Sequence, residues 1–200
     1  MPTRAPSGCL PRYSRAPEAA RVHGTQTGRD AIFTSDGSTL LYARGSQILS
    51  RPAAGGSEAV PLLEGPERTQ SPRPSPDGRF VAYVAANPKT FEPSLLVKPL
   101  GGGDGRWEIS APGNNPRWSG DGRRLFFARD GEVLEVEVQT TPTFRAGVPR
   151  RLFTLAPISS SNVYPGFDVS ADGQRFLLIE PDSQAATTSL VVVLNFTPQR

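Results

Sequence analysis

The chain has 200 residues, a length that allows one domain of ordinary size or a row of small repeats with a continuous core. Hydrophobic residues make up 36% of it, and Gly 20 plus Pro 21 stays below the share of roughly 25–30% that is typical of disordered chains. The net charge is +3, and the basic residues are spread along the chain, which argues against the basic stripe of a nucleic-acid binder. The single Cys9 excludes an intrachain disulfide bond, and no apolar run is long enough to predict a membrane-spanning helix.

Residues 1–28 differ from the rest of the chain. They are rich in Pro, Arg, Ala, Gly and Thr and show neither a helical nor a strand period, so we expect a disordered leader. The apolar stretch of an export signal is missing from them, so the sequence as given predicts no signal peptide and identifies no compartment. His23, which is the only histidine of the chain, falls in this leader.

One short pattern then occurs four times. A hydroxyl residue, any residue, Asp and Gly follow one another, and the Asp residues are 41, 44 and 51 positions apart. This period is the length of a four-stranded blade of a β-propeller. The turn residues of the four copies are Thr34, Asp36 and Gly37; Ser75, Asp77 and Gly78; Ser119, Asp121 and Gly122; and Ser170, Asp172 and Gly173.

Each copy lies between two segments that favour strands. The segments before the turns are residues 31–33, 72–74, 116–118 and 167–169, and those after the turns are 40–43, 80–84, 125–128 and 176–179. An Asp-Gly pair between such segments predicts a hairpin, because Gly accepts a positive φ and Asp tolerates it. The hydroxyl two residues earlier can bond N–H groups of the turn. We therefore interpret the four Asp residues as turn formers and not as acids or calcium ligands, since a calcium loop needs more oxygen ligands.

Further strands complete the repeating unit. A third strand is expected at residues 47–50, 94–97, 132–138 and 190–194, and a fourth at 59–62, 107–109 and 151–154. Within residues 132–138, apolar residues and Glu alternate from Leu134 onward, which predicts one solvent-exposed and one packed face. The last unit stops after its third strand, because only six residues remain. The prediction is an all-β, propeller-type array of about four four-stranded blades over residues 29–197, with blades at 29–64, 70–111, 114–156 and 164–197. It is either a closed four-bladed propeller or an open one whose apolar ends would favour self-association.

The second unit carries a family resemblance. Residues 75–83, Ser-Pro-Asp-Gly-Arg-Phe-Val-Ala-Tyr, resemble the Pro-Asp blade repeat of the TolB-like, WD-like β-propellers of bacteria, and the resemblance covers residues 29–197. The other copies replace the Pro by Ser35, Gly120 and Ala171. Residues 144–153, 168–177 and 191–196 look like the closing blades of a larger propeller, as found appended to receptor-like serine/threonine kinases. Related propellers are often periplasmic or extracytoplasmic.

Catalytic motifs are missing from the sequence. One histidine in the leader is too little for a Ser-His-Asp or Cys-His arrangement or for a His and Cys metal site. Neither the protein-kinase motifs nor the Gly-x-Ser-x-Gly of a hydrolase is present. The Gly-rich residues 101–105 lack the Lys-Ser/Thr pair of a phosphate loop and are interpreted as a turn.

The sequence therefore predicts a non-catalytic module, without cofactor or metal, that binds a protein or a small ligand. The alternative is a regulatory C-terminal fragment of a serine/threonine kinase or of a prolyl-oligopeptidase-type enzyme whose catalytic domain lies elsewhere. Four aromatic residues are candidates for a ligand surface, although aromatics at such positions more often fill the space between blades. They are Trp107, Trp118, Phe126 and Phe127.

Overall fold

The computed structural model describes residues 29–55, 57–155, 166–178 and 192–193, and all the regular structure within them is β-strand. None of these residues forms a helix that could cross a membrane. The leader expected over residues 1–28 lies outside the described residues. So does most of the last expected strand, of which only Val192–Val193 is described.

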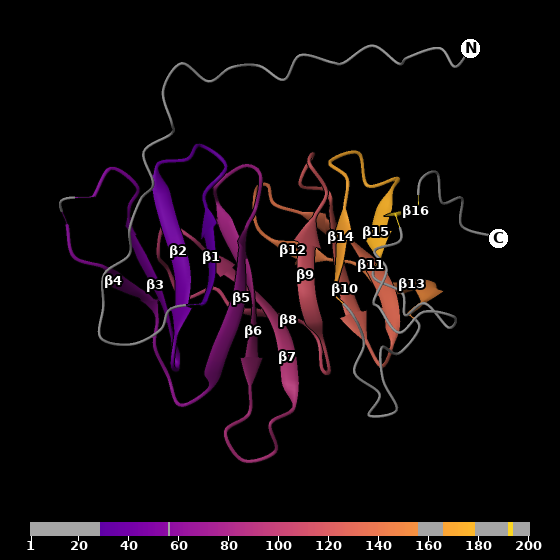
Figure 1. Cartoon of the computed structure of the whole chain (residues 1–200), viewed down its shortest axis with the longest axis horizontal. Helices are drawn as coiled ribbons and strands as arrows, with labels where there is room; N and C mark the ends of the chain where they lie inside the picture. The colour runs from indigo at the N-terminus through magenta and orange to yellow at the C-terminus, as the bar shows by residue number, and fades with distance from the viewer. Residues whose placement is uncertain (1–28, 56, 156–165, 179–191, 194–200) are drawn as a thin grey trace, which may run out of the picture.

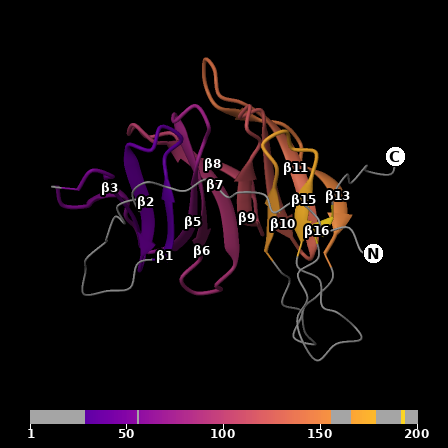
Figure 2. The same cartoon turned by 45° about the horizontal axis from the view of Figure 1, so that its top comes forward.

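The strands form antiparallel sheets in chain order (Figures 1 and 2). The first sheet contains β1 (Arg29–Phe33), β2 (Thr39–Arg44), β3 (Gln47–Pro52) and β4 (Val60–Leu63). The second contains β5 (Arg68–Pro74), β6 (Phe80–Ala86), β7 (Pro93–Pro99) and β8 (Trp107–Ser110). The third contains β9 (Asn114–Trp118), β10 (Arg124–Arg129), β11 (Glu132–Gln139), β12 (Arg145–Ala146) and β13 (Arg150–Thr154). The fourth contains β14 (Phe167–Val169), β15 (Phe176–Leu178) and β16 (Val192–Val193). The predicted all-β array of blade-like sheets is confirmed.

Two details of the third sheet differ from the sequence prediction. Its outer strand comes in two pieces, because β11 is long enough to pair with β12 at one end and with β13 at the other. The face of β11 that was expected to be exposed to solvent is also partly buried. Glu135 is only 4% exposed, and it forms ion pairs with Arg150 and, at 3.8 Å, with Arg124. A buried carboxylate needs such partners, and strand periodicity alone does not reveal them.

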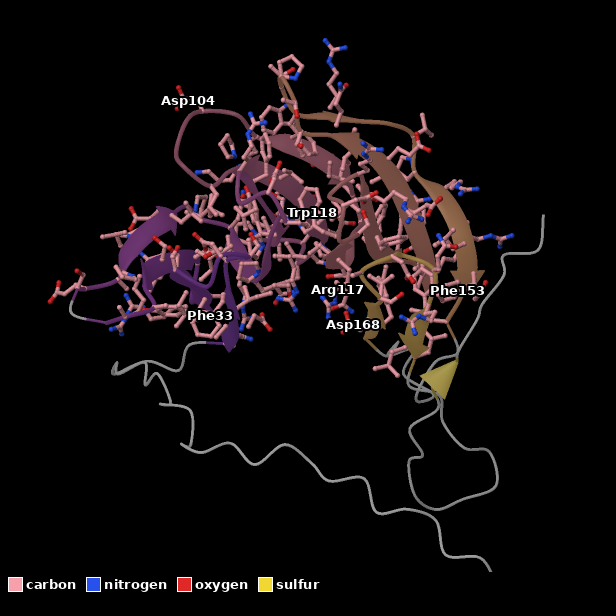
Figure 3. The ribbon with its side chains drawn as sticks, turned by 90° about the horizontal axis from the view of Figure 1, so that it is seen from above. Phe33, Asp104, Arg117, Trp118, Phe153 and Asp168 are labelled. Atoms are coloured by element: carbon pink, nitrogen blue, oxygen red, sulfur yellow. The ribbon has the colours of Figure 1, made fainter. Side chains whose placement is uncertain are left out.

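The sheets follow one another around an arc. The first strands β1, β5, β9 and β14 are neighbours, so they form the inner wall, and the later strands of each sheet lie farther out. Seen from above, the arc is open between the first and the fourth sheet, and the propeller is thus unclosed in the described residues (Figure 3).

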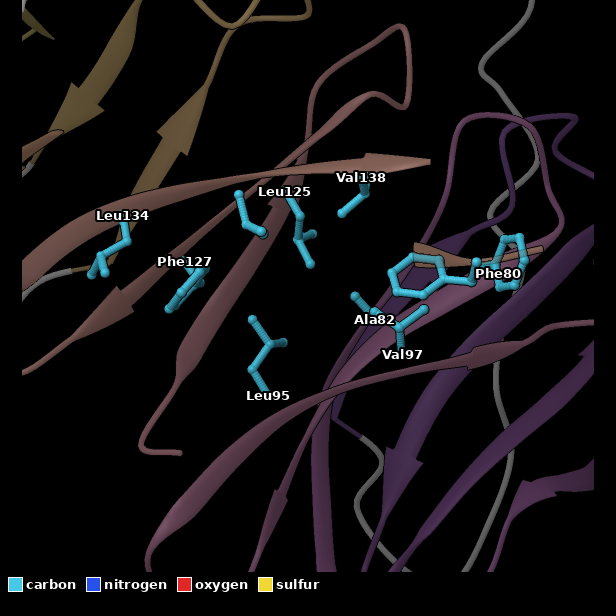
Figure 4. Packing of buried hydrophobic residues seen from close by; sticks show 10 residues of the cluster. Phe80, Ala82, Leu95, Val97, Leu125, Phe127, Leu134 and Val138 are labelled. Carbon is cyan, nitrogen blue, oxygen red and sulfur yellow. The ribbon is translucent and has the colours of Figure 1, made fainter. Parts of the chain in front are cut away.

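The core lies between the faces of neighbouring sheets. The largest cluster joins the second and third sheets (Figure 4). Its buried members are Phe80, Ala82, Leu95, Val97, Leu125, Phe127, Leu134, Val136, Val138 and Phe144. Successive residues of β10 point to opposite faces, so Phe127 packs on the second sheet while Phe126 packs on the fourth. Trp107 fills the same space between sheets, with its ring 5.9 Å from that of Phe80 and 5.0 Å from that of Phe144. These three of the four candidate aromatics are therefore core residues.

We expect the substitution Phe127→Ala to lower the free energy of unfolding by about 3–5 kcal/mol, because it removes a fully buried ring from the contact between two sheets. Urea denaturation followed by circular dichroism measures this loss. Val148→Ala, at a side chain that is 90% exposed, is the control and should change the value by less than about 0.5 kcal/mol. Equal effects of the two substitutions would contradict the assignment of the core.

Candidate functional site

The four Asp-Gly turns share one set of hydrogen bonds. In the third sheet the Ser119 hydroxyl donates to Asp121 Oδ1 at 2.6 Å and accepts from the N–H of Arg124 at 2.9 Å. Asp121 Oδ1 also accepts from the N–H of Arg123 at 3.0 Å, and the N–H of Gly122, whose φ is +69°, donates to the Ser119 carbonyl. The other three turns repeat this arrangement, with hydroxyl–carboxylate distances of 2.6, 2.5 and 2.5 Å for Thr34–Asp36, Ser75–Asp77 and Ser170–Asp172.

These bonds hold the turn carboxylates in their charged form. Hydrogen bonds from the Thr34 and Ser38 side chains lower the pKa of Asp36 to about 2. The Ser119 hydroxyl and a backbone N–H lower the pKa of Asp121 in the same way. At Asp77 burial raises the pKa, but the hydrogen bonds outweigh burial and the net direction is down. Each turn carboxylate thus uses its Oδ1 within the turn. The described residues contain no group of acids, Cys or His that could hold a metal ion.

The turns of neighbouring sheets touch one another at the residue between the hydroxyl and the Asp. The N–H of Gly120 donates to the Ala171 carbonyl at 2.7 Å, and a Cβ at Gly120 would lie 2.9 Å from that oxygen. Pro76 lies against Gly122 of the next turn, where a Cβ would be 3.6 Å from the Pro ring. The third turn therefore carries Gly where the second carries Pro, because the neighbouring backbone leaves no room for a side chain.

A second repeated feature lies on the inner strands of the first three sheets, where each strand contains a β-bulge. Two residues of β1, β5 and β9 face one residue of the next strand, and the first residue of each pair has a positive φ. These left-handed residues are Asp30, Ser71 and Asn115, with φ of 55°, 53° and 52°. A bulge of this kind bends a strand and changes the direction of the side chains beside it. The inner wall is thus not a regular ladder.

The bulged strands border a central groove on the concave side of the arc. It is a cavity of about 570 Å³ that residues of all four inner strands line, and this volume lies within the range of ligand sites. Figure 3 shows Arg117 and Asp168 beside one another here, with Trp118 next to them and Phe33 on the first sheet. Phe33 is 48% exposed and offers apolar surface to the groove.

Two arginines and two aspartates carry the charges of this central groove. Arg73 and Arg117 each donate from Nη1 to the carbonyl of the proline before them, at 2.8 and 2.9 Å. Arg117 Nε also pairs with Asp168 Oδ1 at 3.0 Å. Burial and the charge of Arg117 lower the pKa of Arg73, although an arginine stays protonated at any ordinary pH. Trp118 Nε1 donates to the Arg73 carbonyl at 2.9 Å, so the fourth candidate aromatic both packs on the core and borders the groove.

A larger hollow of about 820 Å³ lies at the turns of the second and third sheets. Asp77 and Asp121 line it, but their carboxylates already serve the turns, and the loop of residues 139–141 forms its other side. The Gly-rich loop of residues 101–105 lies instead beside a smaller cavity of about 230 Å³. The central groove is the better candidate for a binding site, because its lining side chains come from four sheets and not all of them take part in the hydrogen bonds of the turns.

Sequence reasoning missed this groove. It treated residues 72–74 and 116–118 as plain extended segments before the turns. The available signal was the Pro-Arg pair that stands at the same place in two units, with Arg73 and Arg117 two residues before the turn serine. Asn and Asp are also enriched at positive φ, which is a weak signal for the bulges at Asp30 and Asn115.

Comparison with known proteins supports the fold alone. No protein-family model and no curated protein matches the sequence. Among solved structures, TolB from Acinetobacter baumannii has a TM-score of 0.57 at 17% identity over 80% of this chain and 39% of its own. The putative TolB from Agrobacterium tumefaciens has a TM-score of 0.60 at 19% identity over 78% of this chain and 55% of its own. A hypothetical selenium-binding protein from Sulfolobus tokodaii has a TM-score of 0.51 at 13% identity over 76% and 46%.

These matches show that the chain has a TolB-like β-propeller fold. The chain spans about half or less of the length of these structures. The expected resemblance to propellers appended to kinases stays a prediction.

The turn carboxylates make the stability of the folded chain depend on pH in the acidic range. The pKa of Asp36 is about 2 in the folded chain and 3.8 when unperturbed. The contribution of Asp36 to the free energy of unfolding is therefore complete above pH 3.8 and is lost as the pH falls through 2. The other three turn Asp residues act in the same direction. We expect the urea midpoint to fall over this pH window, and to fall less in Asp36→Asn. Asp104→Asn, in an exposed loop, is the control, and an unchanged pH profile in Asp36→Asn would refute the assignment.

Proposed function

We propose that the chain is a non-catalytic binding module and that the central groove holds a protein segment or a small ligand. The observation that carries this proposal is the set of side chains that line the groove. Phe33 and Trp118 offer apolar and aromatic surface, while Arg73 and Asp168 offer charge, and they come from four different sheets. A few polar groups beside apolar walls are the usual composition of a ligand site.

The chemistry of the groove favours binding over catalysis. Ser35 and Ser119 line the groove. The Ser119 hydroxyl donates to a turn carboxylate and accepts from a backbone N–H, so it is held in place as a structural group. A nucleophile needs a neighbouring base, and the carboxylates of the groove already accept hydrogen bonds from the protein. Asp168 accepts from Arg117, and Asp30 accepts from the N–H of Ser71 at 3.0 Å.

The two tryptophans provide a test. Trp107 lies in the core and Trp118 borders the groove, so Trp107→Phe leaves one tryptophan, which reports on the groove. We expect members of a library of short peptides and small fragments to change the emission of Trp118 and to be recovered chemically unchanged by mass spectrometry. In the same background Phe33→Ala should weaken these ligands about tenfold, which is about 1.4 kcal/mol, because it removes an exposed aromatic wall.

The control for this screen is Val148→Ala, on an exposed loop between β12 and β13. It should leave every affinity unchanged. Ligands that bind equally well to Phe33→Ala and leave the Trp118 emission unchanged would place binding elsewhere. Conversion of a ligand into product would contradict the non-catalytic part of the proposal.

A further inference from the structure

We infer that the central groove recognises a carboxylate, and that Arg73 is the residue that binds it. This inference rests on the proposed function, since it assumes that the groove is a binding site.

Four residues occupy the same position in the four units, two places before the hydroxyl residue of each turn. They are Ile32, Arg73, Arg117 and Asp168. Because the inner strands are neighbours and carry the same turn, these side chains lie around one level of the groove, and all four line the cavity. Two adjacent strands, β5 and β9, therefore bring two guanidinium groups to the same place, and burial, followed by the charge of Arg117, lowers the pKa of Arg73.

The two arginines differ in their partners. Arg117 forms an ion pair with Asp168, and the remaining carboxylate of the groove, Asp30, accepts from the N–H of Ser71. Among the described residues no carboxylate lies within ion-pair distance of Arg73, although its side chain is half-buried. Asp30 and Asp168 act on Arg73 without a direct ion pair, and burial and the charge of Arg117 outweigh their effect on its pKa. An anion in direct contact with Arg73 would offset the cost of this burial.

The atoms of Arg73 are arranged for such an anion. Its Nη1 is held by the Pro72 carbonyl at 2.8 Å, and within the described residues this is its one side-chain hydrogen bond. Nε and Nη2 remain, and that pair of N–H groups is an edge that can bind a carboxylate in a bidentate manner. The bulge at Ser71 leaves Ser71 and Pro72 outside the ladder, so the Pro72 carbonyl is available to fix the guanidinium before the ligand arrives.

The surroundings favour a single negative charge. Asp30 and Asp168 also line the groove, and a doubly charged phosphate would meet both of them. A carboxylate carries one charge, and its apolar neighbour can contact Ile32, Phe33 and Trp118 on the same wall. The ligand is thus a carboxylate attached to an apolar group. Its source is either an acidic side chain in a peptide or a small carboxylic acid.

The test uses matched probes in the Trp107→Phe background. Acetyl-Ala-Phe-Glu-Phe-Ala-amide is compared with the same peptide carrying Gln, and 3-phenylpropionate is compared with 3-phenylpropionamide. We expect at least one acid to bind tenfold or more tightly than its neutral partner. The peptide pair and the small-molecule pair tell the two sources of carboxylate apart.

The arginine variants assign the effect to one residue. Arg73→Gln should abolish the preference for the acid, and Arg73→Lys should restore only part of it, because an ammonium lacks the two-pronged edge of a guanidinium. Arg151→Gln removes the same charge from the outer strand β13, where the side chain is 63% exposed and paired with Glu132, and should leave the preference intact. Circular dichroism of the variants checks that each remains folded.

Several outcomes would overturn the inference. Equal binding of the acid and its neutral partner would show that the groove binds ligands without recognising a carboxylate. A preference that survives in Arg73→Gln would mean that the acid binds elsewhere. Failure of all four probes would also refute carboxylate recognition, whereas the proposed function depends on the unbiased library screen and the Phe33→Ala variant.

Discussion

The constraint on which the structure depends is that a small antiparallel sheet with two apolar faces must cover both of them. The central strands show this most clearly, since every residue of β6 from Phe80 to Ala85 is buried. A helix could cover one face, but within the described residues only further sheets are present. The sheets therefore stack face to face and fan around an axis, which brings the first strand of each to the inside. The groove is a consequence of this packing.

The turns and the bulges have different tasks in that arrangement. The turns fix the spacing between sheets, because each one satisfies its own polar groups and then touches the next turn at the residue before the Asp. Ser75 and Ser119 are completely buried, and an unbonded hydroxyl there would cost about 1–3 kcal/mol. The bulges interrupt the ladder beside the axis. They place proline carbonyls where they hold Arg73 and Arg117, which no requirement of sheet packing explains.

The charged residues also divide into those that join the sheets and those that line the groove. Glu135 is buried between sheets, and the ion pairs with Arg124 and Arg150 compensate it. Arg124 also donates to the carbonyl of Asp172 at 2.8 Å and lies over the Phe126 ring, so it joins the third sheet to the fourth. These pairs belong to the architecture. In the groove, Arg73 has no carboxylate of the described residues within ion-pair distance, and the proposed carboxylate site rests on this difference.

Local sequence patterns are enough to predict the strands and the turns of this protein. Asp-Gly pairs and alternating or continuous apolar runs act over a few neighbouring residues, so the strands that follow Asp36, Asp77 and Asp121 were predicted within one or two residues of their observed ends. The sequence also indicated that the four candidate aromatics fill the space between sheets. Trp107, Phe126 and Phe127 do so, whereas Trp118 packs on the core and also borders the groove.

The way in which the inner strands face one another depends on the stacking of the sheets. Arg73, Arg117 and Asp168 are 44 and 51 residues apart in the chain, and their proximity depends on how the sheets stack. The bulges depend on pairing with the next strand, as does the burial of Glu135 against Arg150. A local sequence pattern shows which residues are apolar but not which strand each of them will contact. It therefore does not predict contacts between residues that are so far apart in the chain. Local sequence patterns therefore could not predict the candidate site.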